Sequence, residues 1–307
     1  MMAAKSEARP EAEWGQAAAT VQVGAEESAM EKARRERNRA LIVPREHGAW
    51  GLLLVPMVTA AGVAFRQSTN VFPFVLLLTA ALALFWLRTP LESLLGISAM
   101  RAESKEERSS VAFVVLYLAI VAIVPSSMLV WAGHNPLLWG IGAAAGVAFV
   151  VQAVLRKMGR RTRMLSEIVG TIALTASAPA VYYVITGKFG LAAWMLWLAN
   201  LTFAGNQIHY VQIRIHTAKL IGAHAKLARA WTFALGQLAM AAVLALTCWL
   251  AWMPWLVLLA FAPLLLRGFY YFVQNPAPLR VRRLGWNELA QAIVFCALFI
   301  TTFTLRV

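Results

Sequence analysis

Nine long apolar runs follow one another along this chain of 307 residues, beginning near residue 48. A helix needs about 20 predominantly apolar residues to cross a bilayer, and each run has roughly that length. The runs cover roughly residues 48–65, 70–87, 110–132, 136–155, 167–186, 190–212, 231–250, 253–273 and 286–304. Hydrophobic residues make up 60% of the chain and charged residues 14%, which excludes a soluble globule. We therefore predict an all-α fold, a polytopic integral membrane bundle of nine transmembrane helices.

The positive charges are distributed unevenly between the connections that join these runs. The second, fourth, sixth and eighth connections carry 4, 5, 4 and 3 Lys or Arg residues, whereas the odd-numbered connections carry one or none. Cytoplasmic loops are enriched in Lys and Arg, so this pattern predicts a cytoplasmic N-terminus in a multi-pass membrane protein. The net charge of +14 is then mainly a signal of topology, and we expect no nucleic-acid partner.

The chain is predicted to divide near residue 40 into a tail and a membrane domain. Residues 1–40 hold 7 of the 14 acidic residues and no sustained apolar face, which predicts a disordered cytoplasmic tail. Residues 41–307 form the predicted transmembrane domain. The tail ends in a basic segment that suits anionic lipid headgroups, with Lys32, Arg34, Arg35, Arg37, Arg39 and Arg45. The chain has no aspartate, and its two cysteines lie in apolar runs, so no metal site is predicted.

Polar residues gather at the predicted cytoplasmic ends of several runs, where function and helix capping are competing explanations. Arg45, Glu46 and His47 precede the first run, and Arg88 closes the second. Three glutamates also fit helix caps: Glu92 completes a capping box with Thr89 and Pro90, Glu167 follows Ser166, and Glu288 follows Asn287.

The sixth run is the most polar, and its second half predicts a ligand-binding face. Asn206, Tyr210 and Arg214 are spaced four residues apart and share one helix face, with Gln207 beside them. His209 begins a neighbouring face that also holds Gln212 and His216. Lipid cannot satisfy such groups, so they must face protein or water. A purely structural hydrogen-bond network is the alternative explanation, and Arg267 is either a partner of this face or a snorkelling residue.

The segment Ile42-Val-Pro-Arg-Glu-His-Gly-Ala-Trp-Gly51 resembles the opening signature of the bacterial YwiC-like membrane proteins. The stretch from Asn200 to Arg214 and the turn Arg88-Thr-Pro-Leu91 fit the same family, so the resemblance covers roughly residues 42–307. This family implies a multi-pass protein of the bacterial inner membrane without an established activity.

A more distant similarity is to UbiA-type prenyltransferases, which are nine-helix bundles with active-site motifs at the inner ends of helices two and six. The stretch from Gly159 to Gly170 also looks like part of such enzymes. Those enzymes hold magnesium and a prenyl diphosphate with aspartate-rich motifs, and this chain has no aspartate. The corresponding positions hold Arg88 with Glu92 and Asn206 with Arg214, so recognition of an anion by guanidinium groups replaces the metal.

The main functional hypothesis is a cytoplasm-facing polar cavity that binds a small anionic or phosphorylated amphiphile, such as an isoprenoid or quinone-like lipid. His47 and Glu46 are the candidate acid/base pair for catalysis. The candidate ligand-binding residues are Arg45, Arg88, Glu92, Glu167, Asn206, Gln207, His209, Tyr210 and Arg214. A transporter or exporter of a small organic anion and a non-catalytic membrane scaffold are the alternatives. The sequence identifies no cofactor and leaves enzyme and transporter both open.

Overall fold

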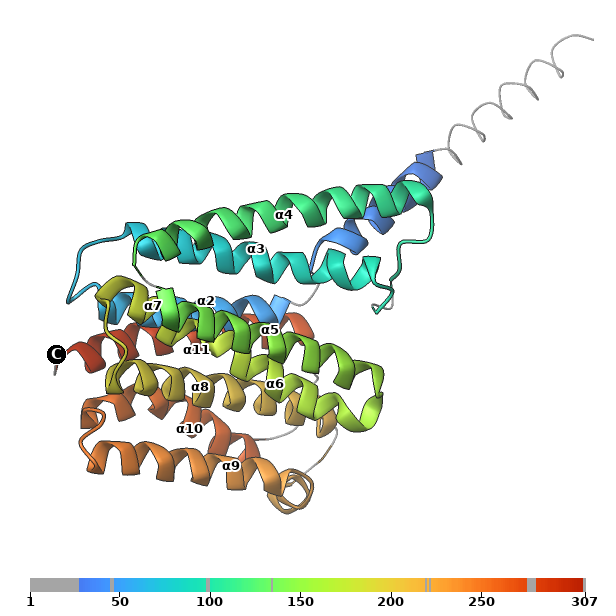
Figure 1. Ribbon diagram of the computed structural model, residues 1–307. Helices are drawn as coiled ribbons and strands as arrows, with labels where there is room; N and C mark the ends of the chain where they lie inside the picture. Colours follow the sequence, from blue (N-terminus) through green and yellow to red (C-terminus); the bar gives the residue numbers. More distant parts are fainter. Residues whose placement is uncertain are drawn as a thin grey trace, which may run out of the picture. The chain divides into compact units, whose positions relative to one another are not determined.

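The computed structural model describes residues 28–44, 47–97, 100–133, 135–218, 220, 222–274 and 280–305 (Figure 1). Every regular element in these residues is helical, which confirms the predicted all-α class. A helix at residues 28–42 is followed by α2 (His47–Ala64), α3 (Phe72–Leu94), α4 (Lys105–Trp131), α5 (Asn135–Lys157), α6 (Arg163–Thr175), α7 (Ser177–Thr186), α8 (Leu191–His216), α9 (Ala223–Trp249), α10 (Leu258–Val273) and α11 (Val281–Thr304). Each of the nine predicted apolar runs overlaps one of these helices or, in one case, two.

Seven helical segments in the described residues are long and apolar enough to cross a membrane. They are Phe72–Leu94, Lys105–Trp131, Leu137–Lys157, Met164–Thr186, Ala223–Trp249, Trp255–Val273 and Arg282–Thr304. The apolar part of α2, Ala49–Ala64, is shorter, and the polar second half of α8 lowers the hydropathy of that helix. The chain is therefore a multi-pass membrane protein in contact with the lipid bilayer, and the count of nine spans and the orientation stay predictions.

The described chain separates into two compact units. The first unit holds the helix at residues 28–42, the end of α3 and the start of α4, with a boundary after Leu118. The second unit holds residues 46–85 and 119–307, and with them most of the helices. Each unit is described by itself below.

The main apolar core of the second unit lies among α2, α7, α8, α10 and α11. The rings of Phe203 in α8 and Phe295 in α11 stack with their centroids 4.0 Å apart. Gly62 lets α2 approach α11 closely, because a Cβ atom built there would lie 2.5 Å from Cδ1 of Ile300. Deeper in this core, Asn200 donates to Thr59 Oγ1 at 2.9 Å, which ties α8 to α2. Small residues and paired polar groups thus fix the helices around α8.

Two departures from regular helices have local causes. The predicted run 167–186 is divided between α6 and α7 at Ala176, three residues before Pro179. Proline has no N–H for the carbonyl of Thr175, so the α-helical ladder is interrupted at this point. The second departure is at Ala230 in α9, where φ is −119° and ψ is 27°. The apolar run predicted from residue 231 begins directly after this kink.

The predicted helix caps are wrong in three places, because the helices extend farther than the apolar runs. α3 continues through Thr89 and Pro90 to Leu94, so Thr89 does not begin a new helix. α6 begins at Arg163 and α11 at Val281, which places Ser166 and Asn287 inside these helices. The glutamates that follow them are therefore not first-turn caps.

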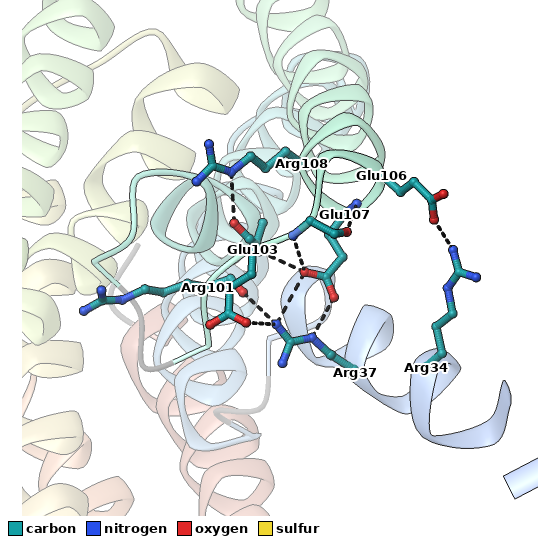
Figure 2. A network of polar contacts seen from close by, with 9 residues as sticks. Arg34, Arg37, Arg101, Glu103, Glu106, Glu107 and Arg108 are labelled. Carbon is teal, nitrogen blue, oxygen red and sulfur yellow. Dashed lines mark hydrogen bonds and ion pairs between the residues drawn. The ribbon is translucent and has the colours of Figure 1, made fainter. Parts of the chain in front are cut away.

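In the first unit, the helix at residues 28–42 is held by ion pairs to the start of α4 (Figure 2). Arg37 donates from Nε to Glu107 at 2.6 Å and from Nη2 to Glu103 at 3.2 Å. Arg34 pairs with Glu106 in the same way. Hydrogen bonding to the Glu107 carboxylate raises the pKa of Arg37 above its ordinary value. The basic helix is thus partly neutralised by acidic residues of the same unit.

The C-terminal end of this helix is anchored by side chains of α3. Ser93 Oγ donates to the carbonyl oxygen of Leu41 at 3.3 Å, and Trp86 Nε1 donates to that of Ile42 at 3.0 Å. Leu41 is buried in a small apolar cluster with Ala102 and Val111. The predicted disordered tail, residues 1–40, and its boundary with the membrane domain stay predictions. Residues 28–40 of this tail are helical in the structure, and residues 1–27 lie outside the described part of the chain.

Candidate functional site

The polar face of α8 meets the aromatic residue Tyr271 and the cation Arg267 of α10. The Arg267 guanidinium lies over the Tyr210 ring, with Cζ 4.0 Å from the ring centroid. The rings of Tyr210 and Tyr271 pack edge to face with their centroids 6.0 Å apart. The Arg214 guanidinium lies 5.5 Å from the Tyr271 ring centroid. Tyr210 and Tyr271 are 7% and 2% exposed, so these cation–π contacts are largely removed from water. The spacing of Tyr210 and Arg214 along α8 therefore brings both residues against α10.

Arg267 also forms the central ion pair of this region. Its Nη1 atom donates to Glu288 Oε1 at 2.6 Å, which joins α10 to α11. The two side chains are only 14% and 16% exposed. Ionisable residues at membrane depth are costly, so they are candidates for function when they face the interior of a bundle.

Several polar atoms around this ion pair are buried and lack a hydrogen-bond partner in the described part of the chain. The donors are Nε and Nη2 of Arg267 and Nε of Arg214. The acceptors are Oδ1 of Asn206, Oε2 of Glu288 and Oε1 of Gln291. Such atoms are normally satisfied by protein, by ordered water or by a ligand. Arg267 and Glu288 are ion-pair partners, and Gln291 lies one turn from Glu288 on α11.

Lys226 of α9 adds another positive charge next to Tyr271. Its ammonium lies 4.9 Å from the Tyr271 centroid and donates to the carbonyl oxygens of Tyr271, at 3.2 Å, and of Gln274. Lys226 is 2% exposed and close enough to Arg214 for the two charges to repel each other. The Tyr271 hydroxyl is itself hydrogen-bonded to Thr217.

We name these residues the buried polar cluster: Asn206, Tyr210, Arg214, Lys226, Arg267, Tyr271, Glu288 and Gln291. In the described residues, the cluster holds three cations, Arg214, Lys226 and Arg267, and one carboxylate, Glu288. Glu288 is paired with Arg267, so the charges of Arg214 and Lys226 have no carboxylate partner there. Uncompensated positive charge in a site with little water favours the binding of an anion.

The other predicted residues of α8 have partners around the cluster. Gln207 Nε2 donates to the backbone oxygen of Glu288 at 3.0 Å. His209 packs edge-on against Phe233 of α9, with the ring centroids 5.2 Å apart. Gln212 donates to the carboxylate of Glu167 in α6. These contacts position α8 among its neighbours.

The structure as described does not test the site residues predicted near the first and second runs. Arg45 and Glu46 lie outside the described residues, and His47 is the first residue of α2, with its side chain outside the description. Arg88 and Glu92 belong to the first unit and pair with each other along α3, Nε to Oε1, at 3.0 Å. The roles predicted for these five residues stay predictions.

Sequence reasoning left several residues of the cluster out of the candidate site. The sequence leaves Arg267 open as a partner of α8, and its pattern favours a helix cap for Glu288. Lys226, Tyr271 and Gln291 were not singled out. A charged residue within or beside an apolar run is a usable signal for Arg267 and Lys226. No spacing rule connects them to α8, because they lie on other helices.

The family described as "YwiC-like protein" matches residues 43–182. No curated protein and no solved structure matches the chain, so the similarity to UbiA-type prenyltransferases stays a prediction. The matched residues include α2 to α6 and end inside α7, so the buried polar cluster lies outside them. The predicted resemblance to the YwiC-like family is confirmed over residues 43–182.

Proposed function

We propose that the buried polar cluster binds a small anionic or phosphorylated amphiphile, of an isoprenoid or quinone-like kind. The observation that carries this proposal is the free edge of the Arg267 guanidinium. Arg267 uses Nη1 for Glu288, while Nε and Nη2 are buried and unpartnered in the described residues. Two N–H groups on one edge of a guanidinium match the two oxygens of a carboxylate or phosphate.

The surrounding charges support the same ligand class. Arg214 and Lys226 lie against the Tyr271 ring without a carboxylate partner in the described chain, and they add positive potential beside Arg267. A bound anion would relieve their mutual repulsion. Because the chain contains no aspartate, the proposed recognition depends on guanidinium groups in place of aspartate-held magnesium.

The proposal includes the membrane arrangement predicted from the sequence. In that arrangement, nine spans cross the bacterial inner membrane, and the end of α8 that carries Arg214 faces the cytoplasm. The basic helix at residues 28–42 then lies at the cytoplasmic surface, where Lys32 and Arg39 are available to anionic lipid headgroups. A reaction at His47 and Glu46 stays a separate prediction.

Titration of the purified protein with hexadecyl phosphate tests the proposal. Arg267→Lys keeps the positive charge opposite Glu288 but removes the pair of N–H donors on one edge of the guanidinium. We therefore expect hexadecyl phosphate to bind about tenfold more weakly. Arg214→Gln should weaken binding through loss of positive potential. Bound fractions are measured by native mass spectrometry in a nonionic detergent.

The matched control is Arg229→Lys, which makes the same change at an exposed position of α9. It should bind hexadecyl phosphate as the wild type does. If Arg267→Lys and Arg214→Gln both retain wild-type affinity, the cluster is not the anion site and the proposal is wrong.

A further inference from the structure

Three buried acceptor oxygens of α8 and α11 belong to the buried polar cluster, and one of them is on Glu288, the ion-pair partner of Arg267. They are Oδ1 of Asn206, Oε2 of Glu288 and Oε1 of Gln291, each without a donor in the described residues. Acceptor oxygens repel the oxygens of a fully ionised carboxylate or phosphate. A ligand that offered only an anionic group would therefore leave these oxygens unsatisfied, at a substantial cost in affinity.

The packing of α8 against α11 places two of these acceptors in one layer. Phe203 stacks on Phe295 on one side of this layer, and Gln207 donates to the backbone of Glu288 on the other. Asn206 lies between the two contacts on α8, and Gln291 lies between them on α11. Glu288 is one turn from Gln291 on the same helix. The acceptors are therefore near one another and near Arg267, which pairs with Glu288.

From this arrangement we infer that the ligand carries hydroxyl groups next to its anionic group. This inference rests on the proposed function. A hydroxyl group is both a donor and an acceptor, so it can donate to Asn206, Gln291 or Glu288 and accept from Arg267. The matching ligand class is a hydroxylated anionic amphiphile, such as an alkylglycerol phosphate, rather than a simple alkyl phosphate or fatty acid.

Two probes, one without and one with a hydroxyl group between the alkyl chain and the phosphate, test this inference. Hexadecyl phosphate has the anion and the chain, and 1-O-hexadecylglycerol 3-phosphate adds a free hydroxyl beside the phosphate. We expect the wild-type protein to bind the glycerol compound about tenfold more tightly, because its hydroxyl satisfies buried acceptors. Native mass spectrometry over a concentration series of each probe gives the ratio of the two dissociation constants.

Gln291→Leu removes one acceptor at nearly constant volume and should reduce this ratio toward one. Asn206→Leu is the second variant, for use if the first does not fold. Gln67→Leu is the matched control, because the Gln67 amide already donates to the Tyr182 hydroxyl at 2.9 Å. This control should keep the wild-type ratio, while Arg267→Lys should weaken both probes together.

The outcomes separate the inference from the proposed function. If the wild-type protein binds both probes equally and binding still depends on Arg267, the acceptors are hydrated by water; the inference is wrong and the anion site remains. If neither probe binds, both are wrong. A ratio that stays near ten in Gln291→Leu and in Asn206→Leu would also contradict the inference.

Discussion

The Glu288→Leu variant is expected to lose about 3 kcal/mol of unfolding free energy, in the range measured when one partner of a buried ion pair is removed. The substitution leaves the Arg267 cation buried over Tyr210 without its carboxylate. Leucine has a volume close to that of glutamate, so the lost unfolding free energy comes mainly from the Arg267 charge that is left buried without a partner. Unfolding in mixed micelles, with increasing fractions of a denaturing detergent, measures this change.

The double variant Arg267→Met/Glu288→Leu should recover most of this loss, because a buried ion pair replaced by apolar residues is often neutral or stabilising. Glu106→Leu is the matched control. The carboxylate of Glu106 also pairs with an arginine, but its side chain is 77% exposed, and its replacement should leave stability unchanged. An unchanged unfolding free energy in Glu288→Leu would show that the Arg267 charge is solvated or compensated by another group.

The Gln237→Met variant is expected to be more stable than the wild type by about 1–2 kcal/mol, because burial of an unsatisfied amide is costly. Gln237 of α9 is 0% exposed, and neither Oε1 nor Nε2 has a partner in the described residues. Its amide packs against Gly268, where an added Cβ atom would lie 2.4 Å from Nε2. Methionine has a similar length, no strong polar group and enough flexibility to fill the same space. The unfolding assay used for Glu288→Leu measures this gain.

Gln152→Met is the matched control for this prediction. Gln152 also packs against a glycine, Gly170, but its Nε2 donates to the carbonyl oxygen of Ser166 at 3.1 Å. Loss of this bond should destabilise the control by about 1 kcal/mol. If Gln237→Met is destabilised as strongly as Gln152→Met, ordered water or another group satisfies the Gln237 amide.

The helices can be predicted from hydropathy, but their ends cannot. The apolar run at 286–304 predicts α11, yet this helix begins at Val281. The rules for caps assign Asn287 to a helix start, because polar residues after a loop look like a first turn. In a membrane protein the helix continues beyond the apolar part into the headgroup region, so caps and apolar boundaries do not coincide. Pro90 was also interpreted as a helix start, and it lies inside α3.

The candidate site can be predicted only where its residues share one helix. The four-residue spacing of Asn206, Tyr210 and Arg214 predicts a common face, because it follows from helix geometry. The pairing of Arg267 with Glu288 depends on the register between α10 and α11. Register between helices is set by packing, such as that of Phe203 on Phe295, and no local sequence pattern specifies it.

The proposed anion site in the buried polar cluster should be occupied when the protein is in its own membrane. The most direct test is native mass spectrometry of the protein extracted from that membrane with a mild detergent, with wild type and Arg267→Lys compared side by side. We expect the wild type to carry a bound anionic species. This species should be absent or strongly reduced on Arg267→Lys and retained on Arg229→Lys. Identical spectra for the three proteins, with or without a bound species, would contradict the proposed anion site.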